Sequence, residues 1–94
     1  MSVRKTAHLA EVAPRGRDGF PLAPGAACYL LDPPHAGVKV VTIGKIDPVG
    51  TWGKSMPMQM WSAADGASVP GAGIGHPTAT HADLLAQLGY EVAR

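Results

Sequence analysis

The chain has 94 residues, a net charge of +1 and 16% charged residues, against about 25% in a typical soluble domain. This length allows one domain, and a chain so short buries only about two-thirds of its unfolded surface, so its core is thin. With 12 glycines and 9 prolines, the chain is rich in turns. The low charge argues against partners that are attracted by long-range electrostatics.

The first residues do not resemble a targeting segment. Thr6, His8 and Glu11 interrupt any apolar stretch long enough for a signal peptide. No apolar run approaches the roughly 18 residues of a membrane-spanning helix. Cys28 is the one cysteine of the chain and cannot form an internal disulfide. We therefore expect a cytoplasmic protein that has no membrane contact.

Residues 1–25 are predicted to be an N-terminal arm and linker, ahead of a single α+β domain over 26–94. Residues 14–25 hold three prolines and three glycines, a composition typical of irregular connections. The arm also carries cations, which predict phosphate contacts if the protein is a nucleic-acid-associated regulator. No aromatic residue interleaves them for base stacking. These cations are Arg4, Lys5, Arg15 and Arg17.

Two strands are predicted early in the domain, over 26–31 and 38–43. Proline has no N–H to donate, so the pair Pro33 and Pro34 is expected to end the first strand. Residues 38–43 are rich in β-branched side chains and apolar on both faces, which favours a central position in the sheet. The short connection, closed by Gly37, predicts antiparallel pairing.

A third strand is predicted over 56–63, at an edge of the sheet because Pro57 lies near its start. A turn is expected at 64–66. A short fourth strand is expected at 68–69.

A helix of about nine residues is predicted near the C-terminus. Thr80 can cap its first N–H groups, and Asp83 stands at the position of the acidic member of a capping box. Gly89 ends the helix, with Tyr90 packing back on Leu85. The sequence thus predicts an α+β fold, with a small twisted antiparallel sheet of three to four strands packed against this helix.

Four segments of the chain form a recognisable pattern: Tyr29-Leu30-Leu31-Asp32-Pro33-Pro34, Ala64-Asp65-Gly66, Thr80-His81-Ala82-Asp83-Leu84-Leu85 and Leu88-Gly89-Tyr90-Glu91-Val92. Together they resemble small uncharacterised proteins of actinobacteria and their bacteriophages. The resemblance covers about residues 27–92 and implies a bacteriophage or actinobacterial origin, but it transfers no functional residue. Residues 1–25 and the methionines of the third strand depart from the pattern.

Motifs for catalysis and cofactors are not found in the sequence. The glycines of 71–75 lack the spacing and the lysine of a phosphate-binding loop. His76 and His81 have only a loose metal-ligand spacing, with His35 and Cys28 elsewhere in the chain. No nucleophile stands beside a base. We therefore expect a protein that is not an enzyme and holds no metal or cofactor.

Tryptophan and methionine are common on binding surfaces, and both gather in residues 52–61. We interpret this segment as a contact surface for a host protein, in a non-enzymatic phage-type protein that modulates that host protein. The alternatives are methionines that fill the core, a nucleic-acid-associated regulator, and a small homodimeric structural protein. The predicted contact residues are Trp52, Lys54, Met56, Met58, Met60 and Trp61.

Overall fold

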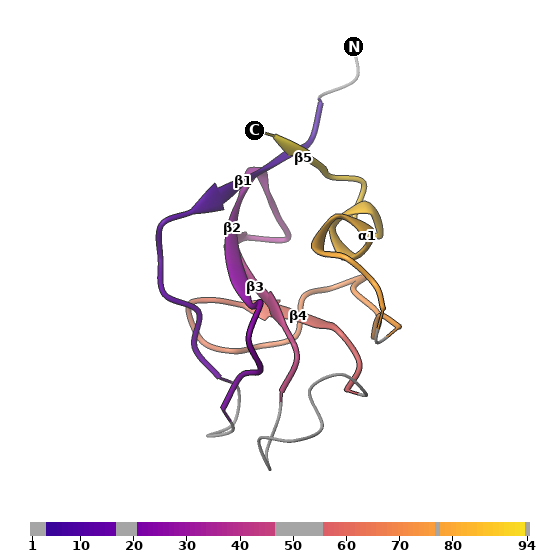
Figure 1. Cartoon of the computed structure of the whole chain (residues 1–94). Helices are drawn as coiled ribbons and strands as arrows, with labels where there is room; N and C mark the ends of the chain where they lie inside the picture. Colours follow the sequence, from indigo (N-terminus) through magenta and orange to yellow (C-terminus); the bar gives the residue numbers. More distant parts are fainter. Residues whose placement is uncertain (1–3, 17–20, 47–55, 77, 94) are drawn as a thin grey trace.

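The computed structural model describes residues 4–16, 21–46, 56–76 and 78–93. Within these residues the chain forms five strands and one helix (Figure 1). The elements are β1 (Thr6–Ala10), β2 (Ala27–His35), β3 (Val38–Gly44), β4 (Gln59–Ser62), α1 (His81–Ala86) and β5 (Glu91–Ala93).

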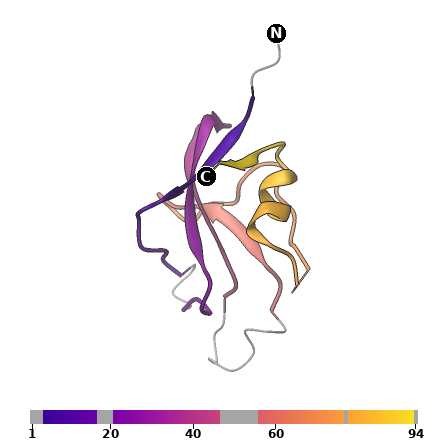
Figure 2. The same ribbon diagram turned by 45° about the horizontal axis from the view of Figure 1, so that its top comes forward.

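The strands form one sheet in the order β4-β3-β2-β1-β5. β1 to β4 pair with their neighbours antiparallel, whereas β1 and β5 pair parallel. The α+β class, the β2–β3 pairing and the central place of β3 are confirmed. The expectation of an antiparallel sheet of three to four strands is wrong, because β1 and β5 add a parallel pair. The helix α1 lies on one side of the sheet in both views (Figures 1 and 2).

β1 lies inside the sheet, between β2 and β5. The expected arm over 1–25 is therefore not separate from the domain at Thr6–Ala10. Ala7 has an exposed fraction of 0% and belongs to the core, whereas Leu9 is exposed. A strand with one small buried side chain has a weak hydrophobic pattern, which explains why the sequence alone favoured an arm.

β2 continues through Pro33 and Pro34 to His35, so the prediction that these prolines end the strand is wrong. β1 pairs with β2 only as far as Asp32, and the register between β2 and β3 shifts between Leu30 and His35. The two prolines thus lie where the sheet needs no N–H donor from β2, and their φ suits extended backbone.

The ends of α1 confirm the predicted caps. Thr80 Oγ1 accepts from the Asp83 N–H at 3.1 Å, and Asp83 Oδ2 accepts from the Thr80 N–H at 2.9 Å. Gly89 has φ +83°, and its N–H donates to the Ala86 carbonyl at 3.0 Å. The Tyr90 N–H donates to the Leu85 carbonyl, also at 3.0 Å, which completes a Schellman motif. The helix spans six residues rather than nine because the chain turns at 87–89.

The core lies between the sheet and α1. On the other face of the sheet, Cys28, Thr42 and Trp61 occupy paired positions of β2, β3 and β4 and are also buried. The Cys28 Sγ and Thr42 Oγ1 atoms are 3.4 Å apart, within hydrogen-bond range. The residues of the core between sheet and helix are Ala7, Tyr29, Leu31, Val41, Ile43, Met58, Met60, Val69, Leu84, Leu85, Leu88 and Tyr90.

Candidate functional site

Three of the predicted contact residues are core residues. The exposed fractions of Met58, Met60 and Trp61 are 9%, 4% and 2%. Met58 and Met60 face α1, as in the alternative that places the methionines in the core, and Trp61 is buried on the opposite face. Met60 and Trp61 are therefore not available as contact residues in the single chain, whereas Met58 also lines a groove that is described below.

The remaining contact residues are placed differently. Met56 is half-buried at the start of the segment that leads to β4. Trp52 and Lys54 lie outside the described residues.

The predicted basic arm does not form one basic patch in the described part of the chain. Arg4 Nη2 lies 2.9 Å from Glu91 Oε2, beside β5. Lys5 Nζ lies 5.6 Å from the centre of the Tyr90 ring. Arg15 lines a pocket beside β4, at the opposite end of the sheet from β5. Arg17 lies outside the described residues.

No cluster of three His, Cys, Asp or Glu side chains that could hold a metal ion occurs among the described residues. His76 hydrogen-bonds Thr78, and His35 Nε2 lies 2.6 Å from the Pro70 carbonyl oxygen, as suits histidines with local structural roles. Within the same part of the chain, no helix is long and apolar enough to cross a membrane.

A groove on the helix side of the sheet brings together an aromatic floor and polar groups. Its volume is about 530 Å³. The sheet supplies Tyr29 and Val92, and the first turn of α1 supplies His81 and its cap. Such a mainly apolar concavity with a few convergent polar groups is the usual form of a binding site. We call it the helix-side groove; it is lined by Tyr29, Met58, Thr80, His81, Ala82 and Val92.

Tyr29 and His81 form a hydrogen-bonded pair in this groove. The Tyr29 hydroxyl lies 3.1 Å from His81 Nδ1, and the rings meet edge to face with centroids 5.7 Å apart. Burial raises the pKa of Tyr29, so its phenol keeps its proton at neutral pH. When this hydroxyl donates to Nδ1, His81 Nε2 carries the imidazole hydrogen and can donate to a bound molecule.

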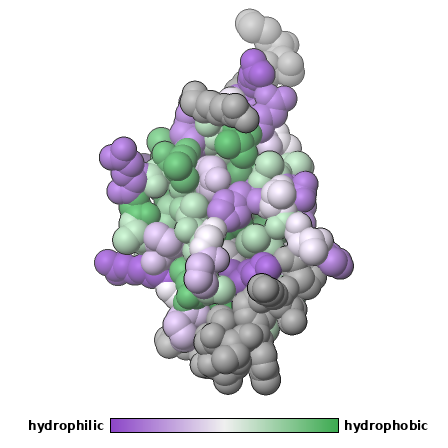
Figure 3. All heavy atoms as spheres, in the orientation of Figure 1, coloured by the Kyte–Doolittle hydropathy of each residue, from purple (hydrophilic) through white to green (hydrophobic). Residues whose placement is uncertain are grey.

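Exposed apolar side chains extend the helix-side groove along β1 and β5. Leu9 is opposite Tyr29 in the β1–β2 register, so the two side chains share one face of the sheet. The exposed fractions of Leu9 and Val92 are 65% and 39%. In Figure 3, hydrophobic atoms gather over β1 and β5. Leu9 and Val92 are not among the contact residues predicted from the sequence, because neither β1 nor β5 is predicted from it.

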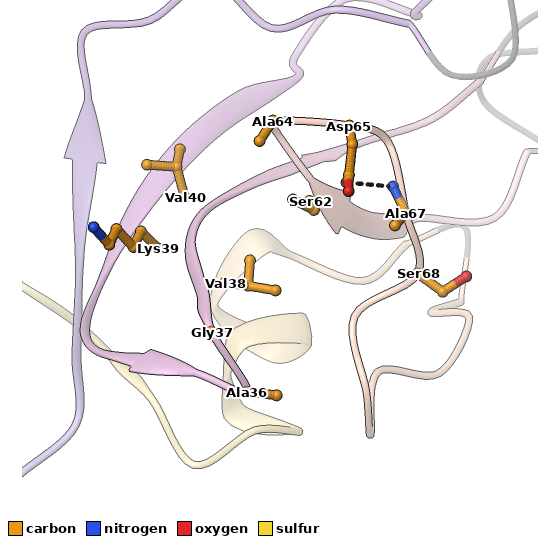
Figure 4. Close-up of a pocket in the computed structure, with 10 residues that line it drawn as sticks. All are labelled: Ala36, Gly37, Val38, Lys39, Val40, Ser62, Ala64, Asp65, Ala67 and Ser68. Atoms are coloured by element: carbon orange, nitrogen blue, oxygen red, sulfur yellow. Dashed lines mark hydrogen bonds between the residues drawn. The ribbon is translucent and has the colours of Figure 1, made fainter.

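A second cleft, of about 430 Å³, lies between the start of β3 and the turn that follows β4 (Figure 4). Its lining is mostly small side chains, including Ala64 and Ala67. The Asp65 carboxylate accepts from the Ala67 N–H at 3.0 Å and so stabilises the predicted turn at 64–66. Because this carboxylate has a structural role, the helix-side groove is the better candidate for a binding site.

Comparison with known proteins gives no family for this chain. No protein-family model, curated protein or solved structure matches it. We therefore infer the role of the candidate site from its geometry alone.

The two buried tyrosines predict how stability depends on pH. Burial raises the pKa of Tyr29 above 10.0; burial, and then the charge of Asp32, raise that of Tyr90, whose hydroxyl donates to the Pro33 carbonyl. A group whose pKa is raised by folding stabilises the fold below its unfolded pKa and loses that effect as pH rises through the folded value.

The free energy of unfolding should therefore fall as pH rises above 10. Urea unfolding below and above this pH measures the change, and the Tyr29→Phe and Tyr90→Phe variants should show a smaller fall than the wild-type chain. An equal fall in all three proteins would assign the effect to other groups.

Proposed function

We propose that this chain is a small non-enzymatic module that binds an apolar segment of another protein in the helix-side groove. The observation that carries this proposal is the exposure of Leu9 and Val92 beside that groove. Exposed apolar side chains that adjoin a concave surface are typical of protein contact sites. The pair of Tyr29 and His81 supplies the polar group that orients the bound segment.

The chemistry of that pair favours binding over catalysis. Because burial raises the pKa of Tyr29, the phenolate is scarce at neutral pH, and the hydroxyl offers a hydrogen bond rather than a nucleophile. The nucleic-acid alternative has less support, because the described cations of the arm lie at different edges of the sheet. Arg4 is already paired with Glu91.

The resemblance to small phage and actinobacterial proteins suggests what the partner is. In this proposal the chain acts in the bacterial cytoplasm, and the bound segment belongs to a host protein that the chain modulates. Contact through apolar and aromatic groups suits a protein with few charges, because affinity then depends on close packing rather than on long-range attraction.

The test compares two exposed apolar residues. A tagged chain captures proteins from an actinobacterial host lysate, and the retained protein is purified and titrated against variants. Leu9→Asp should weaken binding about tenfold or more, because it removes an apolar contact and buries a charge in the complex. Ile74→Asp is the matched control, since Ile74 is 71% exposed in a loop outside the groove. Equal effects of the two substitutions, or capture of no protein, would contradict the proposal.

A further inference from the structure

The two edges of the sheet differ in how their backbone groups are used. At the β4 edge, the Ser62 N–H donates to the Ala67 carbonyl at 2.9 Å. The Gly75 N–H donates to the Met58 carbonyl at 2.8 Å, just before β4. The segment after β4 thus folds back and covers this edge with the chain's own backbone. An edge covered in this way is protected from pairing with other molecules.

At the edge formed by β5, the backbone N–H and C=O of one residue point away from the sheet. The Glu91 N–H donates to the Lys5 carbonyl at 3.0 Å, so the peptide groups of Glu91 face β1. Backbone direction alternates along a strand, so the N–H and C=O of Val92 face away from β1. Among the described residues, none pairs with either group. Val92 therefore presents one donor and one acceptor on the outer side of the sheet.

We propose that this edge pairs antiparallel with β5 of a second copy of the chain, around a two-fold axis at Val92. A residue whose N–H and C=O both point outward can exchange two hydrogen bonds with its own counterpart, which is the hydrogen-bonded pair of an antiparallel ladder. The same patch then serves both copies, as a two-fold interface requires. The two sheets join into one, with α1 of each copy on the same face.

The side chains of β5 fit this register. Val92 lies beside Val92 of the second copy, which covers an apolar side chain that is 39% exposed in the single chain. Glu91 lies opposite Ala93 of the second copy, so the two carboxylates do not face each other. Each Glu91 also keeps its ion pair with Arg4 in its own chain, at 2.9 Å.

A second copy suits this edge better than a free peptide does. β5 has only three residues, so a pairing strand gains few hydrogen bonds. A disordered peptide must lose conformational freedom to pair, whereas β5 of a second copy is already ordered against its own β1. The inference does not rest on the proposed function, because it uses the outward backbone groups of Val92, whereas the proposed function is tested at the side chain of Leu9 in β1.

The first experiment measures molar mass by light scattering and sedimentation from micromolar to millimolar concentrations. The wild-type mass should rise from 9.7 kDa toward twice that value. Val92→Pro should keep the chain monomeric, because it removes an N–H that takes no part in pairing with β1. Val92→Lys should have the same effect by placing like charges across the axis. Ile74→Lys is the control and should associate like wild type.

Circular dichroism checks that each variant folds, and Val92→Lys decides the test if Val92→Pro does not fold. A wild-type chain that is monomeric throughout would overturn the proposal. So would folded Val92→Lys that associates as tightly as wild type.

A crosslink tests the register directly. Paired residues of this kind have Cα atoms about 5.5 Å apart, within the range of a disulfide. A Val92→Cys variant should therefore form a disulfide-linked dimer on oxidation, whereas Ile74→Cys should not. Cys28 is buried and does not compete. Equal crosslinking by the two variants would show random collision and contradict the register.

Discussion

Replacing Trp61 with alanine should lower the free energy of unfolding by about 3–5 kcal/mol, the usual cost of removing a fully buried aromatic side chain. Trp61 is 2% exposed, in a row with Cys28 and Thr42 on the face of the sheet away from α1. The whole free energy of unfolding of a native domain is about 5–15 kcal/mol, so the variant loses a large share of its stability. The fall in the urea midpoint measures the loss.

The same substitution separates a core role from a contact role. Trp61→Phe should keep most of the stability because it leaves a smaller cavity. Ile74→Ala, at a residue that is 71% exposed, should change the midpoint little. If Trp61→Ala has the urea midpoint of wild type but no longer binds the partner protein, then Trp61 is not a core residue. The contact role predicted from the sequence would then be the correct one.

The features that the sequence predicted are local ones. Thr80 and Asp83 are three residues apart, and Leu85 and Tyr90 are five apart, so each bond between them depends on nearby residues. The strand over 38–43 was also predicted with close to its observed bounds, because its β-branched run continues through its full length. Short-range hydrogen bonds and long apolar runs leave a clear pattern in one sequence.

The features that the sequence did not predict depend on long-range pairing. β1 and β5 are at opposite ends of the chain and pair parallel, with Thr6 opposite Glu91 and His8 opposite Ala93. Each is short and has few apolar residues, so neither shows a strong period of two. Because Leu9 and Val92 belong to these strands, the helix-side groove could not be found before the pairing was known.

A similar reason applies to Tyr29 and His81. Their hydrogen bond joins residues that are 52 positions apart. The sequence around His81 predicts only the first turn of a helix, and the sequence around Tyr29 predicts only a strand. Neither predicts the contact between the two residues. Met60 is buried in the core, and its prediction as a contact residue failed for a different physical reason. A methionine stripe with a period of two suits a core face as well as a surface, and only the position of α1 decides between them.

Gly44→Ala should lower the free energy of unfolding by about 1–3 kcal/mol, through overpacking rather than through a cavity. Gly44 is buried at the end of β3. A Cβ atom there would lie 2.7 Å from the Ala26 Cβ and 3.3 Å from the Ala26 Cα. Neither atom can move away by side-chain rotation, so the backbone between β2 and β3 must separate. The urea midpoint of the variant measures this cost.

Gly73→Ala is the matched control. The nearest atom to a Cβ at Gly73 is Gln87 Oε1 at 3.9 Å, so the added methyl group meets no obstacle. This variant should have unchanged or slightly higher stability, since alanine reduces the freedom of the unfolded chain. If Gly44→Ala is as mild as Gly73→Ala, then β2 and β3 lie further apart at this end than described. Thr42 lies two residues before Gly44 in β3, so its packing with Cys28 and Trp61 would then be looser as well. The loss of unfolding free energy caused by Trp61→Ala should be smaller in that case.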